Sequence, residues 1–211
     1  MALSLKSLFT KIEKILFLIK LSKSNIFENY LYKENYNFDK LIRFCKGKKI
    51  ALVGNSRKLL KEKNDIDSYD VVIRINIIPL EEYHESIGKR CDILMLSNGA
   101  TNLLNATLPK VYLTNKNRHI TKYAKGDLYH FPILWWKELF NILSARPTSG
   151  AMAFYLLIKI LKDPNITLFG FDHDTKTWYS SIAPKNLPHN YKNEKKLFAS
   201  LLNKKIKYAK T

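Results

Sequence analysis

The stretch that decides the fold is Ile50–Ser56, with the sequence IALVGNS. Its four apolar residues end directly at a Gly-Asn-Ser turn, which is typical of a buried strand in a parallel sheet. Ligands of open α/β sheets bind at the carboxyl ends of the strands, where a glycine allows close backbone approach. Gly54, Asn55 and Ser56 are therefore candidate ligand contacts, and ordinary turn chemistry is the alternative interpretation of the same residues.

Strands and helices alternate outward from this stretch. Short buried strands are predicted at Ile50–Val53, Val71–Ile75, Asp92–Leu96, Val111–Thr114 and Ile166–Phe169. Helices are predicted at Phe38–Phe44, Arg57–Lys63, Ile133–Leu143, Ala151–Leu161 and about Asn193–Lys207. This alternation predicts a single Rossmann-like α/β/α sandwich with a mostly parallel sheet over residues 49–211. Residues 1–48 are expected to form an N-terminal helical extension, because a chain of 211 residues needs no second core.

Composition limits the class of protein. With 46% hydrophobic and 12% aromatic residues the chain can bury a core, which excludes a disordered or low-complexity protein. Two cysteines, Cys45 and Cys91, are too few for a disulfide scaffold and fit a reducing compartment. The net charge of +18 calls for an anionic partner, which could be nucleic acid, a membrane surface or a phosphate-bearing substrate.

The N-terminal segment predicts a basic amphipathic helix. Apolar residues recur at helical spacing, and lysines lie among and beside them, at Leu5, Leu8, Ile12, Leu16 and Ile19 and at Lys6, Lys11, Lys14, Lys20 and Lys23. Packing on the protein's own domain and docking on an anionic membrane surface both fit this pattern. The sequence predicts neither a membrane span nor a secretory signal, since it has no apolar run of the required length.

Two further segments supply polar groups at predicted element ends. Arg74 and Asn76 close the predicted strand that ends near Ile75, and their spacing of two places them on one face of that strand. Thr148 or Ser149 can cap the helix that follows them, and Gly150 lies in its first turn. The free N–H groups of a helix start form a phosphate site, so these residues are candidate ligand contacts as well as ordinary caps.

The last two candidates lie near the C-terminus. A strand breaks at Gly170-Phe171, and the following Asp172-His173-Asp174 superficially matches an Asp-x-Asp metal site, although acidic residues are common in loops. His189 precedes the terminal helix and could accept a proton from a hydroxyl group. Glu194 could cap that helix or orient the imidazole, and an isolated surface histidine is the alternative.

Together these segments resemble a sialyltransferase of glycosyltransferase family 29. Val53–Ser56 with Ile66–Asn76 resembles the family's large motif, and Ile87–Arg90 resembles its continuation. Pro147–Gly150 through Phe171 is similar to the small motif, and Trp178-Tyr179 stands where the third motif is expected. His189 and Glu194 reproduce the very small motif. The resemblance covers about Lys49 to the C-terminus.

The resemblance implies a GT-A-like variant fold and a reaction. Family members move sialic acid from CMP-sialic acid to a glycan hydroxyl, with inversion and without a metal or another cofactor. By this resemblance His189 is the general base, Glu194 supports that end of the site, and Tyr179 is the leading candidate to stabilise the departing phosphate, with His173 as a substitute. The implied donor contacts are Gly54, Asn55, Ser56, Arg74, Asn76, Thr148, Ser149, Gly150, Gly170, Phe171, Asp172 and His173.

Departures from the family leave alternatives open. No cysteine lies between Pro147 and Gly170, so the disulfide of the animal members is absent, as in a cytosolic enzyme of a microbe or virus. Ser180 and Ser181 follow Tyr179 in place of the third-motif histidine. A transferase for another CMP-linked ulosonic acid such as Kdo is an alternative. A basic nucleic-acid-binding protein is a second alternative. The chain lacks a helix-turn-helix, zinc-finger or RNA-recognition signature, so we expect no nucleic-acid partner.

Location and acceptor follow from the charge distribution. Residues 1–24 carry five lysines against Glu13, and residues 185–211 carry eight lysines against Glu194. Because the predicted donor contacts lie outside both runs, the charge is better explained by attraction to an anionic surface than by the site itself. We therefore expect a cytoplasmic protein with peripheral contact at the inner face of the membrane, where a lipid-linked glycan could be the acceptor.

Overall fold

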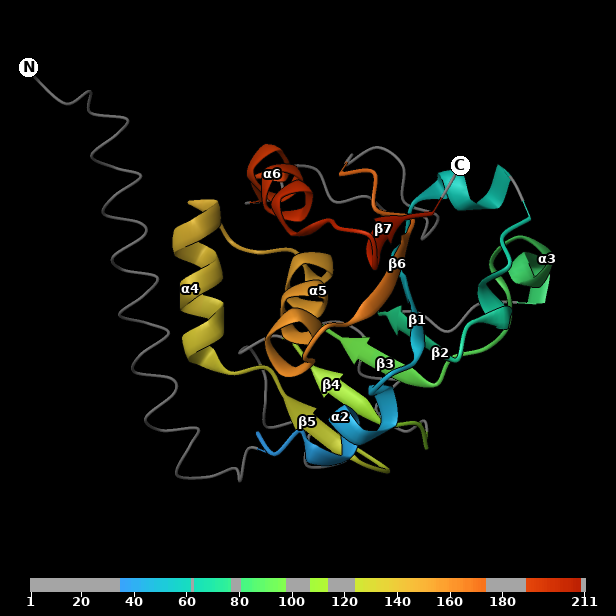
Figure 1. Cartoon of the computed structure of the whole chain (residues 1–211), viewed down its shortest axis with the longest axis horizontal. Coiled ribbons are helices and arrows are strands. Elements are labelled where there is room, and N and C mark those ends of the chain that lie inside the picture. Colours follow the sequence, from blue (N-terminus) through green and yellow to red (C-terminus); the bar gives the residue numbers. More distant parts are fainter. Residues whose placement is uncertain are drawn as a thin grey trace, which may run out of the picture.

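A seven-stranded parallel sheet forms the centre of the molecule (Figure 1). The computed structural model describes residues 35–61, 63–76, 81–97, 107–113, 124–173 and 189–209. The strands are β1 Lys49–Val53, β2 Val71–Ile75, β3 Ile93–Leu96, β4 Lys110–Tyr112, β5 Leu128–His130, β6 Asn165–Phe169 and β7 Ile206–Tyr208. Their spatial order is β5-β4-β3-β2-β1-β6-β7, and every neighbouring pair is parallel.

Helices cover both faces of this sheet. The α-helices are α2 Asp39–Cys45, α3 His84–Ile87, α4 Ile133–Leu143, α5 Ser149–Ile160 and α6 Tyr191–Leu201, and the 3₁₀ turns are η1 Arg57–Lys61, η2 Ile66–Ser68 and η3 Glu81–Tyr83. Residues of α2, α4, α5 and α6 share one buried cluster with one side of the strands, and residues of η1, η2 and α3 share another with the opposite side. In Figure 1, α4 and α3 accordingly lie on opposite sides of the sheet. The expected α/β/α sandwich is confirmed.

The central strands are buried on both faces, as parallel strands between helical layers must be. In β1, Ile50 and Leu52 pack in the cluster that contains α5, whereas Ala51 and Val53 pack in the cluster that contains α3. Both clusters exclude water almost completely at this strand, since all four side chains are at most 1% exposed. The carboxyl end of β1 therefore has a fixed position between β2 and β6.

Helix α5 brings its N-terminus to the same part of the molecule. Residues 151–157 are all buried, and the helix packs against β2 and β3. Thr148 caps the helix, because its hydroxyl oxygen accepts a hydrogen bond from the N–H of Ala151 at 3.0 Å. A helix buried on this scale holds its first turn rigidly against the strand ends.

Several boundaries differ from the sequence expectations. The predicted helix at residues 57–63 is the short 3₁₀ turn η1, and β5 and β7 were not predicted. The predicted final helix ends at Leu201 instead of Lys207, because the Asn203 side-chain oxygen accepts from the N–H groups of Lys205 and Ile206 and turns the chain into β7.

The expected N-terminal extension falls almost entirely outside the described residues, apart from α2 near its end. Its packing or membrane contact stays a prediction. Within the ranges that the structure describes, no helix has the length and apolarity needed to cross a membrane. Cys45 and Cys91 are both free thiols.

Candidate active site

Asn55 lies at the carboxyl end of β1 with one polar atom unused. Its side-chain nitrogen donates to the carbonyl oxygen of Ile75 at 3.2 Å, which orients the amide. Its side-chain oxygen is buried and accepts no hydrogen bond from the part of the chain that the structure describes. A buried acceptor without a partner is costly, so this oxygen is a candidate contact point for a donor group of a ligand.

Asn76 lies next to Asn55 in the sheet, at the carboxyl end of β2. Its backbone is in the left-handed region, with φ of 63°. Its side-chain oxygen accepts from the backbone N–H of Ser97 at 2.6 Å and from the Ser97 hydroxyl at 2.9 Å. Asn76 therefore ties β2 to β3, and only its amide nitrogen could serve a ligand.

Arg74 is a structural residue and not the donor contact that the sequence suggested. Its side chain is 2% exposed and donates to the carbonyl oxygens of Ile87, Gly88 and Arg90 at 2.7, 3.1 and 2.6 Å. The long side chain turns away from the strand end and fills the connection between β2 and β3. A donor contact, which the sequence suggested, is not compatible with this burial and with these three bonds.

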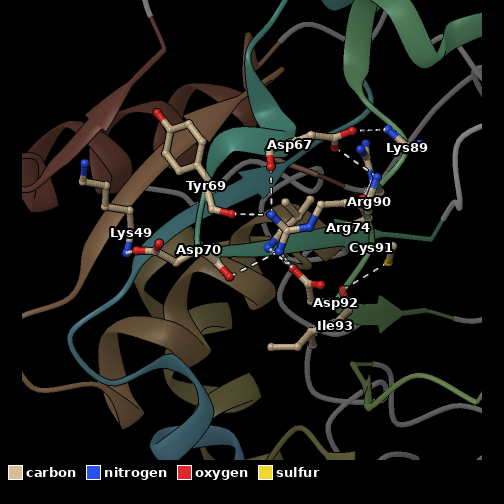
Figure 2. A network of polar contacts seen from close by, with 11 residues as sticks. Lys49, Asp67, Tyr69, Asp70, Arg74, Lys89, Arg90, Cys91, Asp92 and Ile93 are labelled. Carbon is tan, nitrogen blue, oxygen red and sulfur yellow. Dashed lines mark hydrogen bonds and ion pairs between the residues drawn. The ribbon is translucent and has the colours of Figure 1, made fainter.

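The rest of the large motif forms a polar network at the opposite edge of the sheet (Figure 2). The Asp67 carboxylate accepts from the backbone N–H groups of Lys89 and Arg90 at 2.9 and 3.0 Å. The Arg90 guanidinium donates to the Asp92 carboxylate at 2.8 Å and to the carbonyl oxygens of residues 67, 69 and 70. A Cβ at Gly88 would lie 2.3 Å from an Asp67 oxygen. These motif residues hold the segments before β2 and β3 together.

Ser56 and Asp172 join the ends of β1 and β6. The Ser56 hydroxyl donates to the Asp172 carboxylate at 2.6 Å, and the Lys58 ammonium lies 3.9 Å from the same carboxylate. Ser56 is 2% exposed. Asp174 lies outside the described residues, within which no group of three His, Cys, Asp or Glu side chains gathers. Ser56 and Asp172 thus brace the edge of the sheet.

The candidate glycines serve close packing of the chain against itself. A Cβ at Gly54 would lie 2.6 Å from the Gly170 carbonyl oxygen, and one at Gly150 would lie 2.9 Å from the Phe171 ring. Gly170 has φ of 68°, where a side chain is strained. Protein atoms therefore occupy the space that a side chain would need at these glycines, and contact of their backbone with a nucleotide stays a prediction.

His173 is directed toward the C-terminal elements. Its Nε2 lies 3.0 Å from the Tyr208 hydroxyl, and its ring packs edge-on against Phe198 with centroids 4.8 Å apart. Burial lowers its pKa. His173 therefore links β6 to β7 and α6. The other candidate for the phosphate, Tyr179, lies outside the described residues.

Glu194 fastens α6 to the start of α5. Its two carboxylate oxygens accept from the backbone N–H and the hydroxyl of Thr148 at 2.8 and 2.9 Å. The side chain is 2% exposed. Burial raises its pKa to about 7, and the two bonds from Thr148 act in the opposite direction. Thr148 thus caps α5 and also binds Glu194 of α6. The backbone N–H groups of Ser149 and Gly150 have no partner in the described ranges.

His189 is held in a defined tautomer. Its Nδ1 lies 2.7 Å from the carbonyl oxygen of Arg146. A carbonyl can only accept, so Nδ1 carries the proton and Nε2 presents its lone pair. Burial lowers the pKa of His189, and the positive charge of Arg146 lowers it further, while the backbone hydrogen bond raises it. The imidazole is therefore neutral near pH 7 and can accept a proton.

Two residues beside His189 escaped the sequence analysis. Tyr191 packs edge-on to the imidazole with centroids 6.0 Å apart, and its buried hydroxyl has no partner in the described ranges. Burial raises its pKa to about 12. Arg146 contributes the carbonyl that fixes His189. No periodicity marks either residue, and proximity in sequence to Thr148 and His189 was the only available signal.

The sheet and its carboxyl edge define a fold that solved sialyltransferases share. A crystal structure of a mammalian sialyltransferase in complex with Gal-beta-1-3GalNAc-ortho-nitrophenol matches with a TM-score of 0.58 and 19% identity, over 90% of this chain and 85% of that chain. Another crystal structure of a mammalian sialyltransferase matches with a TM-score of 0.59 and 20% identity, over 85% of this chain and 81% of that one. At these identities the likeness establishes the fold.

Sequence comparison then identifies the family. The family model for glycosyltransferase family 29 (sialyltransferase) matches residues 23–131. Sialyltransferase-like protein 2 of Arabidopsis thaliana is 39% identical over 57 residues, which are 26% of this chain and 13% of that protein. The family model covers more than half of the 211 residues, so the chain belongs to glycosyltransferase family 29. The match to the Arabidopsis protein spans a small part of that relative's length.

Proposed function

We propose that this protein transfers sialic acid from CMP-sialic acid to a hydroxyl group of a glycan, with inversion at the anomeric carbon. The observation that carries the proposal is the neutral, oriented imidazole of His189 beside the capped start of α5. A general base and an anion-binding helix start are the two groups that displacement of a nucleotide monophosphate requires. Family membership supplies the donor class.

In the proposed reaction His189 acts on the acceptor. The acceptor oxygen forms a bond to the anomeric carbon while its proton passes to His189 Nε2. The bond from the anomeric carbon to the phosphate oxygen breaks, and its electron pair leaves with CMP. The hydrogen bond from Nδ1 to the Arg146 carbonyl at 2.7 Å keeps Nε2 aimed at the acceptor and stabilises the imidazolium that forms.

The donor is proposed to lie across the carboxyl edge of the sheet. The N–H groups of Ser149 and Gly150, with the positive end of the α5 dipole, would hold its phosphate. The buried oxygen of Asn55 and the amide nitrogen of Asn76 would contact the nucleoside. A monophosphate leaving group carries less charge than a diphosphate, so protein donors can stabilise it without a metal ion or another cofactor.

Glu194 is proposed as a positioning residue that acts through Thr148. It fixes the cap of α5, which carries the phosphate site, to the helix that follows His189. The two ends of the reaction are thereby held at a constant separation, and such positioning contributes to catalysis without touching the substrate.

The experiment is incubation of the protein with CMP-sialic acid and a galactose-terminated acceptor, lactose or Gal-β1-3GalNAc, with and without EDTA. We expect sialylated product at equal rates in both conditions. CMP-Kdo in place of CMP-sialic acid tests the donor in the same assay. Release of CMP without a sialylated acceptor would overturn the assignment of the reaction. Loss of product in EDTA would overturn the assignment of metal independence.

We further propose that the protein works in the cytoplasm with peripheral contact to an anionic membrane. The exposed lysines of the C-terminal part support this, among them Lys192, Lys195, Lys196, Lys204 and Lys207. Sedimentation with vesicles of 30% phosphatidylserine, compared with neutral vesicles, is the test. Equal retention on both kinds of vesicle would contradict the proposal.

A further inference from the structure

Arg146 carries a partly buried positive charge for which the described part of the chain provides no counter-ion. Its backbone carbonyl accepts from His189 Nδ1, but its guanidinium makes no hydrogen bond and no ion pair with any described residue. Burial lowers its pKa, because it removes part of the guanidinium from water. Removing an arginine from water without a partner is unfavourable, so such a residue is typical of a site that awaits an anion.

Two other arginines, Arg74 in β2 and Arg90 before β3, behave differently. Arg74 donates to three backbone carbonyls, and Arg90 donates to carbonyls and to the carboxylate of Asp92. Their guanidinium groups are used by the fold. Of these three arginines, only Arg146 has a guanidinium without a partner among the described residues. The carboxylate of Glu194 does not pair with it, because both of its oxygens accept hydrogen bonds from Thr148.

The groups around Arg146 add to its positive potential. Arg146 stands two residues before Thr148, the cap of a helix of 12 residues, whose first turn keeps the N–H groups of Ser149 and Gly150. The guanidinium is also close enough to the imidazole for its charge to lower the pKa of His189. The charge of a guanidinium and the N-terminus of a helix are therefore both close to His189 in this part of the fold, and both favour a tetrahedral oxyanion over any cation.

We propose that the Arg146 guanidinium binds the phosphate of the CMP donor and stabilises it as the leaving group. This inference rests on the proposed function. The sequence offered Tyr179, with His173 as a substitute, for this task. His173 is bonded to the Tyr208 hydroxyl, and Tyr179 lies outside the described residues. Arg146 thus contributes at both ends of the reaction. Its carbonyl oxygen orients His189, and its guanidinium is proposed to contact the phosphate oxygen that departs.

The chemical balance of the step needs no further reactant. The bond between the anomeric carbon and the phosphate oxygen breaks with its electron pair on that oxygen. The negative charge that develops there is met by the N–H groups of the guanidinium, which keeps its proton throughout. The acceptor proton moves to His189 Nε2. Because the interaction strengthens as the charge develops, Arg146 should affect turnover more than donor binding.

The test compares binding of CMP and of cytidine by calorimetry in the wild type, Arg146→Gln and Arg146→Lys. The control is Arg43→Gln, which removes an exposed arginine of α2. We expect Arg146→Gln to weaken CMP binding about tenfold to a hundredfold, as for loss of a charged hydrogen-bond pair, and to leave cytidine binding unchanged. Arg146→Lys should recover part of the loss, and Arg43→Gln should behave as the wild type.

Equal CMP affinity in Arg146→Gln and the wild type would overturn the inference. So would parallel loss of CMP and cytidine binding, because that result indicates a structural role. A wild type that binds CMP more tightly than cytidine but transfers no sialic acid would contradict the proposed function alone. Unchanged CMP binding in Arg146→Gln together with normal sialyl transfer would contradict this inference alone.

Discussion

The two edges of the sheet use the same kinds of polar residue in opposite ways. At the amino ends of β2 and β3, Asp67, Arg90 and Asp92 bond to one another and to backbone groups of the segments that they join. At the carboxyl edge and the adjoining helix starts, Asn55, Arg146 and Tyr191 keep polar atoms without partners in the described ranges. The first edge is a scaffold, and the second is the edge at which we propose that the donor binds.

Replacing the base should separate the two edges most strongly. His189→Ala removes the proton acceptor, so turnover should fall by about 10²–10⁴-fold while CMP affinity changes less than about twofold. Initial rates and calorimetry on the same preparation measure both. His84→Ala, which changes a histidine of α3 on the opposite face of the sheet, is the control and should keep full turnover. Unchanged turnover in His189→Ala would remove His189 from the reaction.

The buried contact between Glu194 and Thr148 should make the free energy of unfolding depend on pH. Burial raises its pKa in the folded protein from 4.5 to about 7, so the folded state binds a proton more tightly than the unfolded state. The stabilisation is complete below about pH 4.5 and is lost as the pH rises through 7, a change of roughly 2–4 kcal/mol. Urea unfolding at pH 5 and pH 8 measures it. The lowered pKa values of His173 and His189 act in the opposite direction in both proteins, so the loss of stability from pH 5 to pH 8 that is due to Glu194 is the difference between the wild type and Glu194→Gln. Parallel pH dependence in both proteins would contradict the account.

Removing the Arg90 side chain from the network at the amino ends of β2 and β3 should lower stability and leave CMP binding unchanged. Arg90→Ala leaves three carbonyl oxygens and the Asp92 carboxylate without their donor, which should lower the free energy of unfolding by about 2–3 kcal/mol. Below the unfolding transition, CMP affinity should stay at the wild-type value. The neighbouring control Lys89→Ala should change the free energy of unfolding by less than about 0.5 kcal/mol, because its bond to Asp67 comes from the backbone. Loss of CMP binding in folded Arg90→Ala would blur the distinction between the edges.

Two asparagines give the smallest and sharpest contrast. Asn55→Ala should weaken CMP binding about three- to tenfold and cost little stability, because its buried oxygen has no described partner to lose. Asn64→Ala should do the reverse, since its amide nitrogen donates to the carbonyl oxygens of Leu59 and Ser86 at 2.9 Å. We expect it to cost about 1–2 kcal/mol and to leave CMP binding unchanged. The same response from both variants would contradict the separation of the two roles.

The sequence predicted those parts of the fold that carry a strong pattern. Strand β2 and helix α4 were predicted to the residue, because each is a long apolar or amphipathic run. Strands β5 and β7 have three residues each, Leu128–His130 and Ile206–Tyr208, and were missed because their polar residues leave no continuous apolar run. Strand β4 is as short, but it was found because apolar residues 111–113 form such a run. The end of α6 was misplaced because the side chain of Asn203 closes a local turn, and hydrophobic periodicity contains no information about such a turn.

Residue identity predicted where the candidate residues lie in the fold better than it predicted the contacts of each side chain. Asn55, Thr148, His189 and Glu194 do gather near strand and helix ends, as order along a parallel sheet requires. Arg74 could not be separated from a ligand contact by sequence, because the direction of a long side chain depends on a connection 13 residues away. Arg146 could not be selected either, since its lack of a partner is a property of the packed structure.

The most direct test of the central claim is an NMR titration of the ¹⁵N-labelled protein with CMP. The account predicts that the backbone signals of Gly54, Asn55, Ser149 and Gly150 shift together with the His189 ring, and that the signals of Asp67, Arg90 and Asp92 stay in place. Shifts confined to the Asp67, Arg90 and Asp92 network, or no shift at the start of α5, would contradict the assignment of the carboxyl edge as the donor site.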